Sequence, residues 1–453
     1  MPISPEEDGR PSSNIKNGSS YSLFMQLYTK QLQQHILDKT NEKCIGFKYK
    51  IVTQDELLNY QGIIYAMGMI RMPEMAHYWS CSETLFGNLL VKATMTKARF
   101  KEIHRCLSFD IDWILDTICE ILKNCWYPSN ICTVDECIIL FKGRFRGRQH
   151  VRGKPHATGL KLFVICDSYG MPIHFWLYRG KGHALNMSDT TVSYVMDLAK
   201  KLPNRDTRKY TIFADQFYGS KKLANELQEH GFDYILSCQV NHPSEIFANH
   251  LHDNLQKQED VSFLVSEDGK SCAMSFYDSG KCNFLASVGS TSIPPEELER
   301  KTKHNNQKRP RPGIVRTYNL EMGSVDKFDA KLNIYHYRCK HRSWKRCMFF
   351  ATMKMLVTSS LTIFQHFNPA KKPQQQLHHL TAIIYGLTNR GVQRRDSYTL
   401  HHFPLYKSKS KRCEFCSQEG MNSNTKYQCS GCGKYCHPKC WLYLHYPELK
   451  CKH

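Results

Sequence analysis

A change of hydrophobic period near residue 130 is the feature that most constrains the fold of this chain. From there to residue 240, short β-branched or aromatic runs broken by Gly, Pro and Asp alternate with amphipathic segments of helical spacing. The predicted strands are residues 130–141, 159–168, 172–180, 210–217 and 232–240, and the predicted helices between them are residues 187–202 and 220–231. This order, with three strands followed by α-β-α-β, predicts a mixed α/β sheet.

The segments on either side of this sheet have other patterns. Apolar residues recur at helical spacing over residues 22–110, which predicts about four or five helices, with Asp55 as a plausible N-cap of one of them. Residues 117–127 read as a further helix. The apolar run 348–364 contains Lys354 and several hydroxyl groups, so it predicts a buried helix rather than a membrane span.

These patterns predict a division of the chain into seven parts. The expected parts are a disordered tail (1–20), a helical domain (21–128), the first part of the sheet domain (129–239), a β-rich insertion (240–317), the last part of the sheet domain (318–370), a linker (371–400) and a Cys-rich domain (401–453). The first residues carry no basic-then-apolar signal, so we expect a protein that is not secreted. In a protein that is not secreted, we do not expect the 20 Cys to form a framework of disulfide bonds.

The charge balance predicts a polyanionic partner. Lys and Arg number 62 against 41 acids, a net charge of +21. Nucleic acid fits better than an anionic membrane, because the sequence shows neither a basic amphipathic anchor nor a lipidation motif. Generic charge for solubility is the alternative explanation.

Two aspartates lie where neighbouring strands could bring them together. Asp135 is inside the first predicted strand, and Asp215 ends the fourth. Two carboxylates held close together normally share a cation, and an all-oxygen site suits Mg²⁺, which supports phosphodiester cleavage. Asp326 and Asp329 are three residues apart on a predicted helix and share one face. Each feature alone also fits a turn, a cap or a solvated surface.

The end of the chain carries a zinc pattern. Seven of the Cys fall in the last 41 residues, and two CxxC pairs are followed by a Cys-x3-Cys pair and His445. The ligand candidates are Cys413, Cys416, Cys429, Cys432, Cys436, Cys440 and His445. Two tetrahedral zinc ions need eight ligands, and His437 and Cys451 are among the candidates for the eighth. The spacing also resembles RING and PHD folds, which bind other proteins.

The ordered set of motifs resembles that of piggyBac transposases and of the piggyBac transposable element-derived proteins of animals. The motifs that carry the resemblance are "QLYTKQLQQHILDKTN", "HYWS", "TVDECIILFKGR", "KPHATGLKLFVICDS", "FADQFYGS", "YNLEMGSVDKFD" and "HRSW". They occur in the order and spacing of that family, from about residue 22 to the end.

The resemblance implies an RNase H-like catalytic core with an insertion domain, preceded by a helical DNA-binding and dimerisation domain and followed by a cross-brace zinc finger. It implies a magnesium (or manganese) site of Asp135, Asp215 and Asp326, with Asp329 as a supporting acid and Trp344 near the site. Arg144, Arg148 and Trp344 become candidate contacts to double-stranded DNA. A "HFP" element before the finger makes His402 the preferred eighth zinc ligand.

The family implies cut-and-paste transposition at TTAA sites by a nuclear enzyme, which we expect to be a homodimer. The basic runs 307–312 and 406–413 fit nuclear import signals. Three interpretations follow: an active transposase, a domesticated DNA-binding protein without transposition, and a zinc-dependent protein-interaction module. The chain departs from the family after "HRCLSF", where "FDIDWILDTICEIL" follows without the usual intervening stretch. We therefore expect DNA binding to be retained and excision to be weak.

Overall fold

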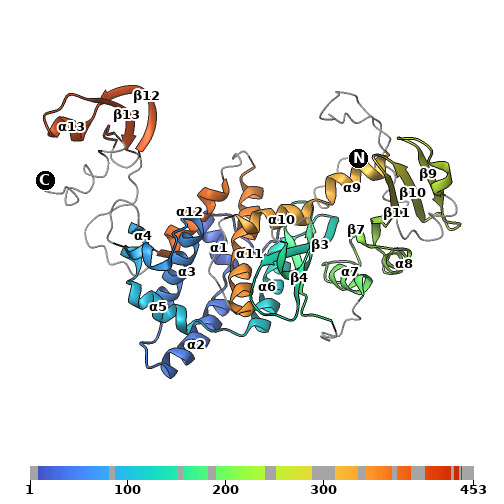
Figure 1. Cartoon of the computed structure of the whole chain (residues 1–453), viewed down its shortest axis with the longest axis horizontal. Coiled ribbons are helices and arrows are strands. Elements are labelled where there is room, and N and C mark those ends of the chain that lie inside the picture. Colours follow the sequence, from blue (N-terminus) through green and yellow to red (C-terminus); the bar gives the residue numbers. More distant parts are fainter. Residues whose placement is uncertain are drawn as a thin grey trace. The chain divides into compact units, whose positions relative to one another are not determined.

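The computed structural model describes most of the chain, in two compact units. The described residues are 9–80, 87–151, 157–181, 190–239, 251–287, 312–334, 343–369, 375–388, 404–429, 433–437 and 440. The units are Met1–Gly391 and Val392–His453, and each is considered by itself (Figure 1).

Helices dominate the first part of the larger unit. They are α1 (Ser20–Leu27), α2 (Lys30–Gly46), α3 (Gln54–Met69), the 3₁₀ helix η1 (Met75–Trp79), α4 (Leu89–Thr94), α5 (Lys97–Cys106) and α6 (Ile111–Cys125). The N-cap of α3 is Thr53 rather than Asp55. Its hydroxyl accepts from the backbone N–H of Glu56, whose carboxylate accepts from the N–H of Thr53, so both ends of a capping box are satisfied.

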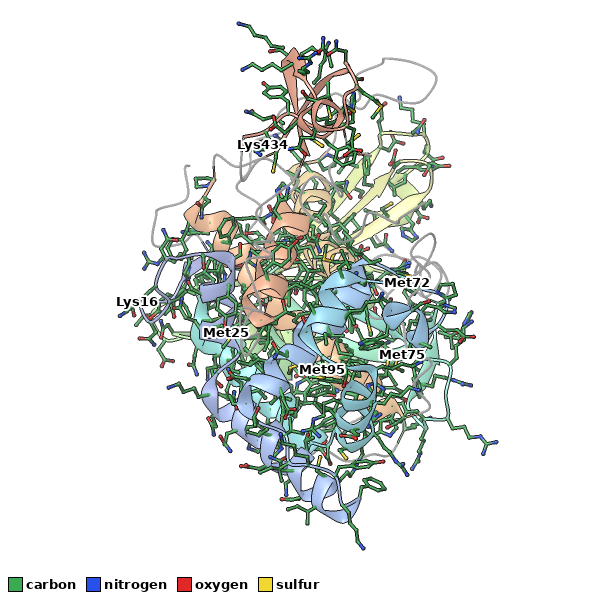
Figure 2. All side chains as sticks on the ribbon, turned by 90° about the vertical axis from the view of Figure 1, so that its left-hand side faces the viewer. Lys16, Met25, Met72, Met75, Met95 and Lys434 are labelled. Atoms are coloured by element: carbon green, nitrogen blue, oxygen red, sulfur yellow. The ribbon has the colours of Figure 1, made fainter. Side chains whose placement is uncertain are left out.

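The core of these helices is closely packed. Met25 of α1 packs against it, and Met95 at the end of α4 is 7% exposed (Figure 2). The carbonyl of Met95 accepts from the indole of Trp79 at 2.7 Å. Buried apolar side chains of this kind supply most of the stability of short helices, which are marginal alone in water.

A single large sheet forms the centre of the unit. Its strands are β3 (Ile131–Leu140), β4 (Arg148–His150), β5 (Thr158–Asp167), β6 (Pro172–Leu177), β7 (Thr211–Gly219), β8 (Asp233–Cys238), β9 (Val261–Val265), β10 (Ser271–Tyr277) and β11 (Lys281–Ser287). The order is β4-β5-β3-β7-β8-β11-β10-β9, and β6 also pairs with β5. Strand β3 is antiparallel to β5 and parallel to β7, and β7 is parallel to β8. The mixed sheet predicted from the sequence is therefore present.

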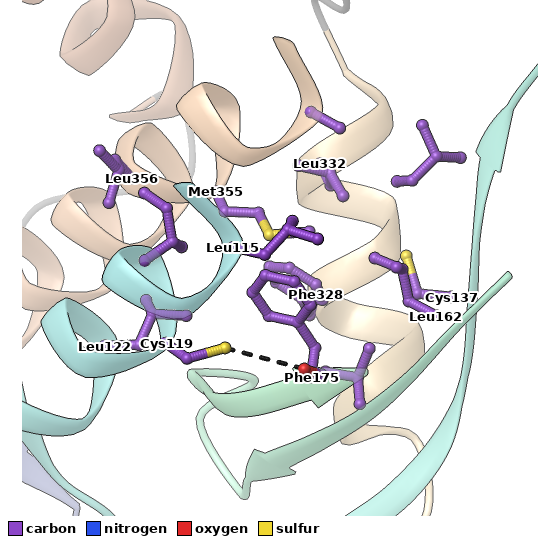
Figure 3. Close-up of a cluster of buried hydrophobic side chains, with 14 of the residues drawn as sticks. Leu115, Cys119, Leu122, Cys137, Leu162, Phe175, Phe328, Leu332, Met355 and Leu356 are labelled. Carbon is purple, nitrogen blue, oxygen red and sulfur yellow. Dashed lines mark hydrogen bonds between the residues drawn. The ribbon is translucent and has the colours of Figure 1, made fainter. Parts of the chain in front are cut away.

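Helices cover both faces of the sheet around β3. On one face lie α6, α10 (Ser324–Asn333) and α11 (Trp344–Phe367), whose side chains meet strand residues Cys137, Leu162 and Phe175 in a common apolar cluster (Figure 3). The thiol of Cys119 on α6 donates to the carbonyl of Phe175 at 3.7 Å. On the other face lie α7 (Thr191–Ala199) and α8 (Lys221–Glu229), where Tyr194 stacks on Phe163 with ring centroids 4.0 Å apart. Strand β3 is thus covered on both sides.

The predicted insertion does not form a sheet of its own. Strands β9, β10 and β11 continue the central sheet through antiparallel pairing of β11 with β8, in which Leu285 lies opposite Leu236. The helix that follows, α9 (Gly313–Glu321), packs Ile314 and Val315 against Met274 and Phe284 of these strands. The alternating pattern was read correctly as strands, but pairing across to β8 cannot be seen from local sequence.

The start of the described chain is also ordered by contacts, although residues 1–20 were predicted to be a loose tail. Strand β1 (Arg10–Pro11) pairs with β2 (Trp126–Tyr127), and Ser12 donates to the carbonyl of Asn124 at 2.7 Å. Nearby, Asp167 is fully buried and accepts from the indole N–H of Trp126 at 2.6 Å. Burial raises the pKa of Asp167 to about 6.

Helix α11 is the predicted buried helix. Within the described residues it is the one helix long and apolar enough to span a membrane by composition, but 94% of its most apolar window is buried inside the structure. That burial is the property of a core helix. It begins at Trp344 and extends to Phe367, slightly beyond the predicted bounds at both ends.

A helix lies inside the range predicted as a linker. Helix α12 (Gln375–Thr388) buries Leu380, Ile383, Ile384 and Leu387, which have helical spacing. It packs on α3 and α1 through two glycines: a Cβ on Gly62 would overlap Thr388, and a Cβ on Gly386 would overlap the ring of Tyr21. Because the segment begins with several polar residues and two histidines, its apolar stripe was not recognised from the sequence.

The approach of α12 to α1 makes Gly386 sensitive to substitution. We expect Gly386→Ala to lower the free energy of unfolding by about 1–3 kcal/mol, because the methyl group meets the rigid Tyr21 ring. Gly46→Ala on α2 is the matched control, since no atom lies within 4 Å of its added Cβ. Urea unfolding of both variants measures the difference. Equal stabilities would contradict packing of α12 against α1.

Candidate active site and metal centre

The face of β3 that carries Asp135 is covered by the segment that carries the third predicted acid. Side chains alternate along a strand, so Thr133, Asp135 and Cys137 share one face. The hydroxyl of Thr133 donates to the carbonyl of Glu321 at 3.0 Å, just before α10 begins. The thiol of Cys137 donates to Asp329 Oδ1 at 3.0 Å, within α10. Asp135 therefore faces the part of the chain between Glu321 and Asp329.

Asp135 and Asp215 lie at the same level of two adjacent strands. In the parallel pair of β3 and β7, Val134 is in register with Ala214, and each aspartate is the next residue along. The carboxylate of Asp215 accepts from the backbone N–H of Phe217 at 2.9 Å, where β7 has an irregular register. Asp135 is 8% exposed, whereas Asp215 is partly exposed. Strand pairing thus brings together two acids that are far apart in the sequence.

The two acids of α10 differ in environment. Asp329 is 8% exposed and also accepts from the amide of Asn333 at 2.8 Å, so it is held by two donors. Asp326 lies in the first turn of the helix and is exposed. Because residues three apart share a helix face, the docking of Asp329 on β3 turns Asp326 toward the same side.

Tyr318 of α9 lies close to the two strand acids. Burial raises the pKa of its phenol above the ordinary value, and the carboxylates of Asp215 and Asp135 raise it further. Its ring also packs edge-on against Phe284, with centroids 5.2 Å apart. Sequence reasoning did not single out Tyr318, Thr133 or Cys137. The two-residue period around Asp135 is the signal that could have found the latter two.

In the described part of the chain, the three predicted acids do not form a tight ligand set. Among the described residues, the carboxylates of Asp135, Asp215 and Asp326 do not lie within 4.8 Å of one another as a group of three. Their oxygen atoms are nevertheless of the type that Mg²⁺ prefers. The chemistry of these donors therefore fits a divalent cation.

Glu136, next to Asp135, has a different role. It points to the opposite face of β3, where Lys161 Nζ lies 2.8 Å from its Oε1 and both side chains are largely buried. Burial opposes ionisation of Glu136, but its hydrogen bonds and the ammonium of Lys161 hold the net pKa below its usual value. Of the two adjacent acids in "TVDE", Asp135 is thus a candidate metal ligand and Glu136 forms a structural ion pair with Lys161.

The three residues predicted to contact DNA, Arg144, Arg148 and Trp344, have different environments. Arg144 is exposed, and no partner for it is found among the described residues. Arg148 on β4 donates to the carbonyls of Lys142 and Gly143 at 3.1 and 2.8 Å, so its guanidinium braces its own loop. Trp344 packs against Phe145, with ring centroids 4.7 Å apart, and Arg179 lies 5.6 Å from its ring.

A Cys3His cluster forms the candidate metal centre of the smaller unit. Ligand atoms of Cys413, Cys416, His437 and Cys440 all lie within 4.8 Å of one another. The Sγ atoms of Cys416 and Cys440 are 3.7 Å apart, and His437 Nδ1 is 3.5 Å from Cys416 Sγ. A tetrahedral zinc ion with Zn–S bonds of about 2.3 Å holds sulfurs about 3.8 Å apart, so the set fits zinc.

The surroundings of the cluster support metal binding. The backbone carbonyl of Asn424 lies 3.0 Å from His437 Nε2, an arrangement that leaves Nδ1 free as a ligand atom. Burial opposes ionisation of Cys413, but hydrogen bonds involving Cys416 and His437 lower its pKa to about 7. A thiolate is the form that binds metal.

The remaining predicted zinc ligands fall into two groups. Cys429 and Cys436 are buried, and the Cys436 thiol donates to the carbonyl of His437 at 3.3 Å, beside the cluster rather than within the four-ligand set. Cys432, His402, His445 and Cys451 lie outside the described residues. His437, one of the alternatives raised by the spacing, is the histidine that the structure places with the three thiols.

Comparison with known proteins agrees with this architecture. The family described as Transposase IS4 matches residues 19–360. The human PiggyBac transposable element-derived protein 3 is 22% identical over 427 residues, which cover 87% of this chain and 70% of that protein. The human chimeric ERCC6-PGBD3 protein has the same identity, and 39% of its length is covered.

A solved structure has the same fold. The piggyBac transposase of a synaptic complex with hairpin DNA has a TM-score of 0.71 to this chain at 19% identity, and the alignment covers 95% of this chain and 98% of the other. Since the family match alone spans most of the chain, this protein belongs to the piggyBac-type transposase family.

Proposed function

We propose that this chain is a metal-dependent DNA transposase in which Asp135, Asp215 and Asp326 hold divalent cations and Asp329 supports them. The observation that carries this proposal is the docking of the α9–α10 segment on β3. Thr133 and Cys137, on either side of Asp135, bond to Glu321 and Asp329, on either side of Asp326. Together with the register of β3 and β7, this contact supports the proposal that the four acids act together.

The chemistry of this region suits phosphodiester cleavage. Mg²⁺ or Mn²⁺ bound by the carboxylates would activate the attacking oxygen and stabilise the leaving oxygen. The protein itself supplies position: Asp135 and Asp215 are fixed by strand pairing, and Asp329 is fixed by Cys137 and Asn333. Arg144 and Trp344 would hold the DNA beside the acids, while Arg148 shapes the loop between them.

We assign the sheet to the RNase H-like class. Support comes from the order β6-β5-β3-β7-β8, with three antiparallel strands followed by two parallel ones, which is the core that the family resemblance implies. We further propose a nuclear homodimer that acts on transposon ends and TTAA targets. The net charge of +21 and the relative solved with hairpin DNA support nucleic acid as the partner.

We propose two zinc ions in the smaller unit. The first is held by Cys413, Cys416, His437 and Cys440. The second would use Cys429 and Cys432, with ligands from the end of the chain. The family match over residues 19–360 lies outside this region, so a zinc-dependent interaction module does not account for the chain as a whole.

A domesticated DNA-binding protein is the second candidate, and the junction before α6 favours it. Phe109 stacks on Phe349 with ring centroids 4.2 Å apart, the N–H of Ser108 donates to Thr40 at 3.2 Å, and Asp110 caps α6. The short connection is therefore packed into the core. If the short connection places the helical region differently from that of the relatives, a misplacement of about 1 Å in the reacting atoms costs on the order of 100-fold in rate, and excision is weak while DNA binding persists.

Substitution of one strand acid tests the catalytic assignment. We expect Asp215→Asn to lower Mg²⁺-dependent cleavage by about 100-fold or more, because the amide keeps the size but loses the charge that holds the cation. DNA affinity should change little. Asp206→Asn, at an exposed loop, is the matched control. Cleavage of labelled duplexes carrying the repeats that flank the gene is the measurement, and full activity in Asp215→Asn would refute the triad.

Zinc content tests the metal centre. We expect the purified chain to hold about two zinc ions and His437→Ala to lose about one of them, because one of four ligands is removed. The larger unit should keep its unfolding transition, since it has its own core. Cys282→Ser, at a partly exposed thiol on β11, is the control. Elemental analysis showing unchanged zinc in His437→Ala would overturn the ligand set.

Extension of the junction tests the choice between the two candidates. A family-like linker inserted between Phe109 and Asp110 should raise excision if the short connection misplaces the helical region, with DNA affinity unchanged. Circular dichroism would verify that α6 remains folded, because Asp110 is its N-cap. Vigorous excision by the unmodified chain would instead favour the active transposase.

A further inference from the structure

The end of α2 and the loop that joins it to α3 expose several apolar side chains close together. We call residues 45–51 the aromatic loop. Within it Ile45 is 68% exposed, Phe47 44% and Ile51 56%. Single exposed apolar residues need no explanation, but a group on one short loop indicates a binding surface.

The aromatic loop is held in shape by a framework that does not bury it. Arg99 on α5 donates to the carbonyls of Lys50 and Ile51 at 3.0 and 2.8 Å, and its guanidinium is itself fixed by Glu56 and Glu102. Asn41 bonds both the N–H and the carbonyl of Val52. The loop is thus preorganised with its apolar side chains in water.

The middle of the loop combines stacked rings with cations. Phe47 and Tyr49 stack with centroids 5.9 Å apart, and the guanidinium of Arg105 lies 4.5 Å from the Phe47 ring and donates to the Tyr49 hydroxyl at 3.1 Å. Lys48 and Lys50 are exposed beside them. Fixed aromatic rings with cations close by are suited to stacking on bases while neutralising phosphates.

The charge around the loop is open to an anionic partner. In the described part of the chain, no carboxylate forms an ion pair with Lys48, Lys50 or Arg105. The nearby acids Glu56 and Glu102 are already paired with Arg99. An anionic membrane is the other possible occupant, but membrane-surface elements are typically amphipathic helices rather than a braced loop with stacked rings.

A second exposed apolar surface shows the opposite charge. Val261, Phe263 and Val265 on β9 are 43%, 65% and 54% exposed, and the adjoining residues Glu259, Asp260, Glu267 and Asp268 are acidic. That surface would repel DNA. It offers a matched control for an exposed phenylalanine.

We propose that the aromatic loop is a DNA-binding site for unstacked bases. Phe47, supported by Ile45 and Ile51, packs on the exposed face of a base, while Lys48, Lys50 and Arg105 hold the phosphates on either side. Apolar wedges of this type act where base pairs open or kink. The inference rests on the DNA-binding part of the proposed function and adds to it a preference for distorted DNA.

The test compares two duplexes of equal length, one fully paired and one with a central unpaired run of thymines, bound by the full zinc-loaded chain in fluorescence anisotropy. We expect Phe47→Ala to weaken binding to the unpaired DNA by about 10-fold and to leave the paired duplex nearly unchanged. The double variant Lys48→Gln, Lys50→Gln should weaken both and reduce the salt dependence. Phe263→Ala should bind both as the unaltered chain does.

The outcomes separate this inference from the proposed function. Failure of the unaltered chain to bind either duplex would overturn both. Binding that shows the same preference in Phe47→Ala as in the unaltered chain would overturn the inference alone. If Phe47→Ala instead abolishes sedimentation with phosphatidylserine vesicles, or dissociates a dimer in analytical ultracentrifugation, while DNA affinities stay unchanged, the loop belongs to a membrane or protein contact and the inference is wrong. Circular dichroism confirms that each variant is folded.

Discussion

The contact between α10 and strand β3 is the interaction on which the candidate site depends. Strand β3 lies between β5 and β7 and is covered on both faces, so polar side chains on it must find partners within the protein. Thr133 and Cys137 find theirs on the backbone of Glu321 and the carboxylate of Asp329. Apolar packing reinforces these bonds, because Phe328 and Leu332 of α10 enter the cluster that includes Cys137 (Figure 3). Loss of this docking would separate the acid of the helix from those of the strands.

Neighbouring carboxylates in the same sheet serve different physical purposes, and their environments separate them. Asp167 is wholly enclosed and accepts from the Trp126 indole and the backbone N–H groups of Ser129, Tyr169 and Met171. It therefore joins the start of the sheet domain to β5 and has no face open to a ligand. Glu136 is neutralised by Lys161. Asp215 is partly exposed and Asp326 is exposed, which distinguishes both from the enclosed carboxylates of Asp167 and Glu136.

Local pattern predicted the strands because their signal is local. The bounds of β3, predicted as 130–141, are Ile131–Leu140, since a buried central strand is a continuous apolar run.

The features that the local pattern did not reveal depend on partners distant in the sequence. Residues 371–400 read as a linker because two histidines obscure an apolar stripe that becomes evident only once α3 and α1 bury it. The strands of the insertion join the central sheet through β8, and no local pattern encodes that pairing. Cysteine spacing pointed to a candidate metal centre but could not choose among the histidines, because the position of His437 beside the thiols depends on how the chain returns to Cys413.

Helix α11 connects the two regions for which we propose DNA contacts, the aromatic loop and the candidate metal site. Arg346, near its start, donates to the carbonyls of His104, Arg105 and Leu107, which end α5. Arg105 in turn fixes Phe47 and Tyr49 in the aromatic loop. Further along, Thr362 of the same helix bonds Lys331 of α10 at 3.3 Å, and α10 carries Asp326 and Asp329. Close-packed interiors resist small displacements, so this chain of contacts holds the loop at a fixed offset from the acids. A DNA segment held by the loop would therefore reach the metal site in a set register, and the geometry of α5 and α11, more than the loop itself, would determine which phosphodiester bond is presented.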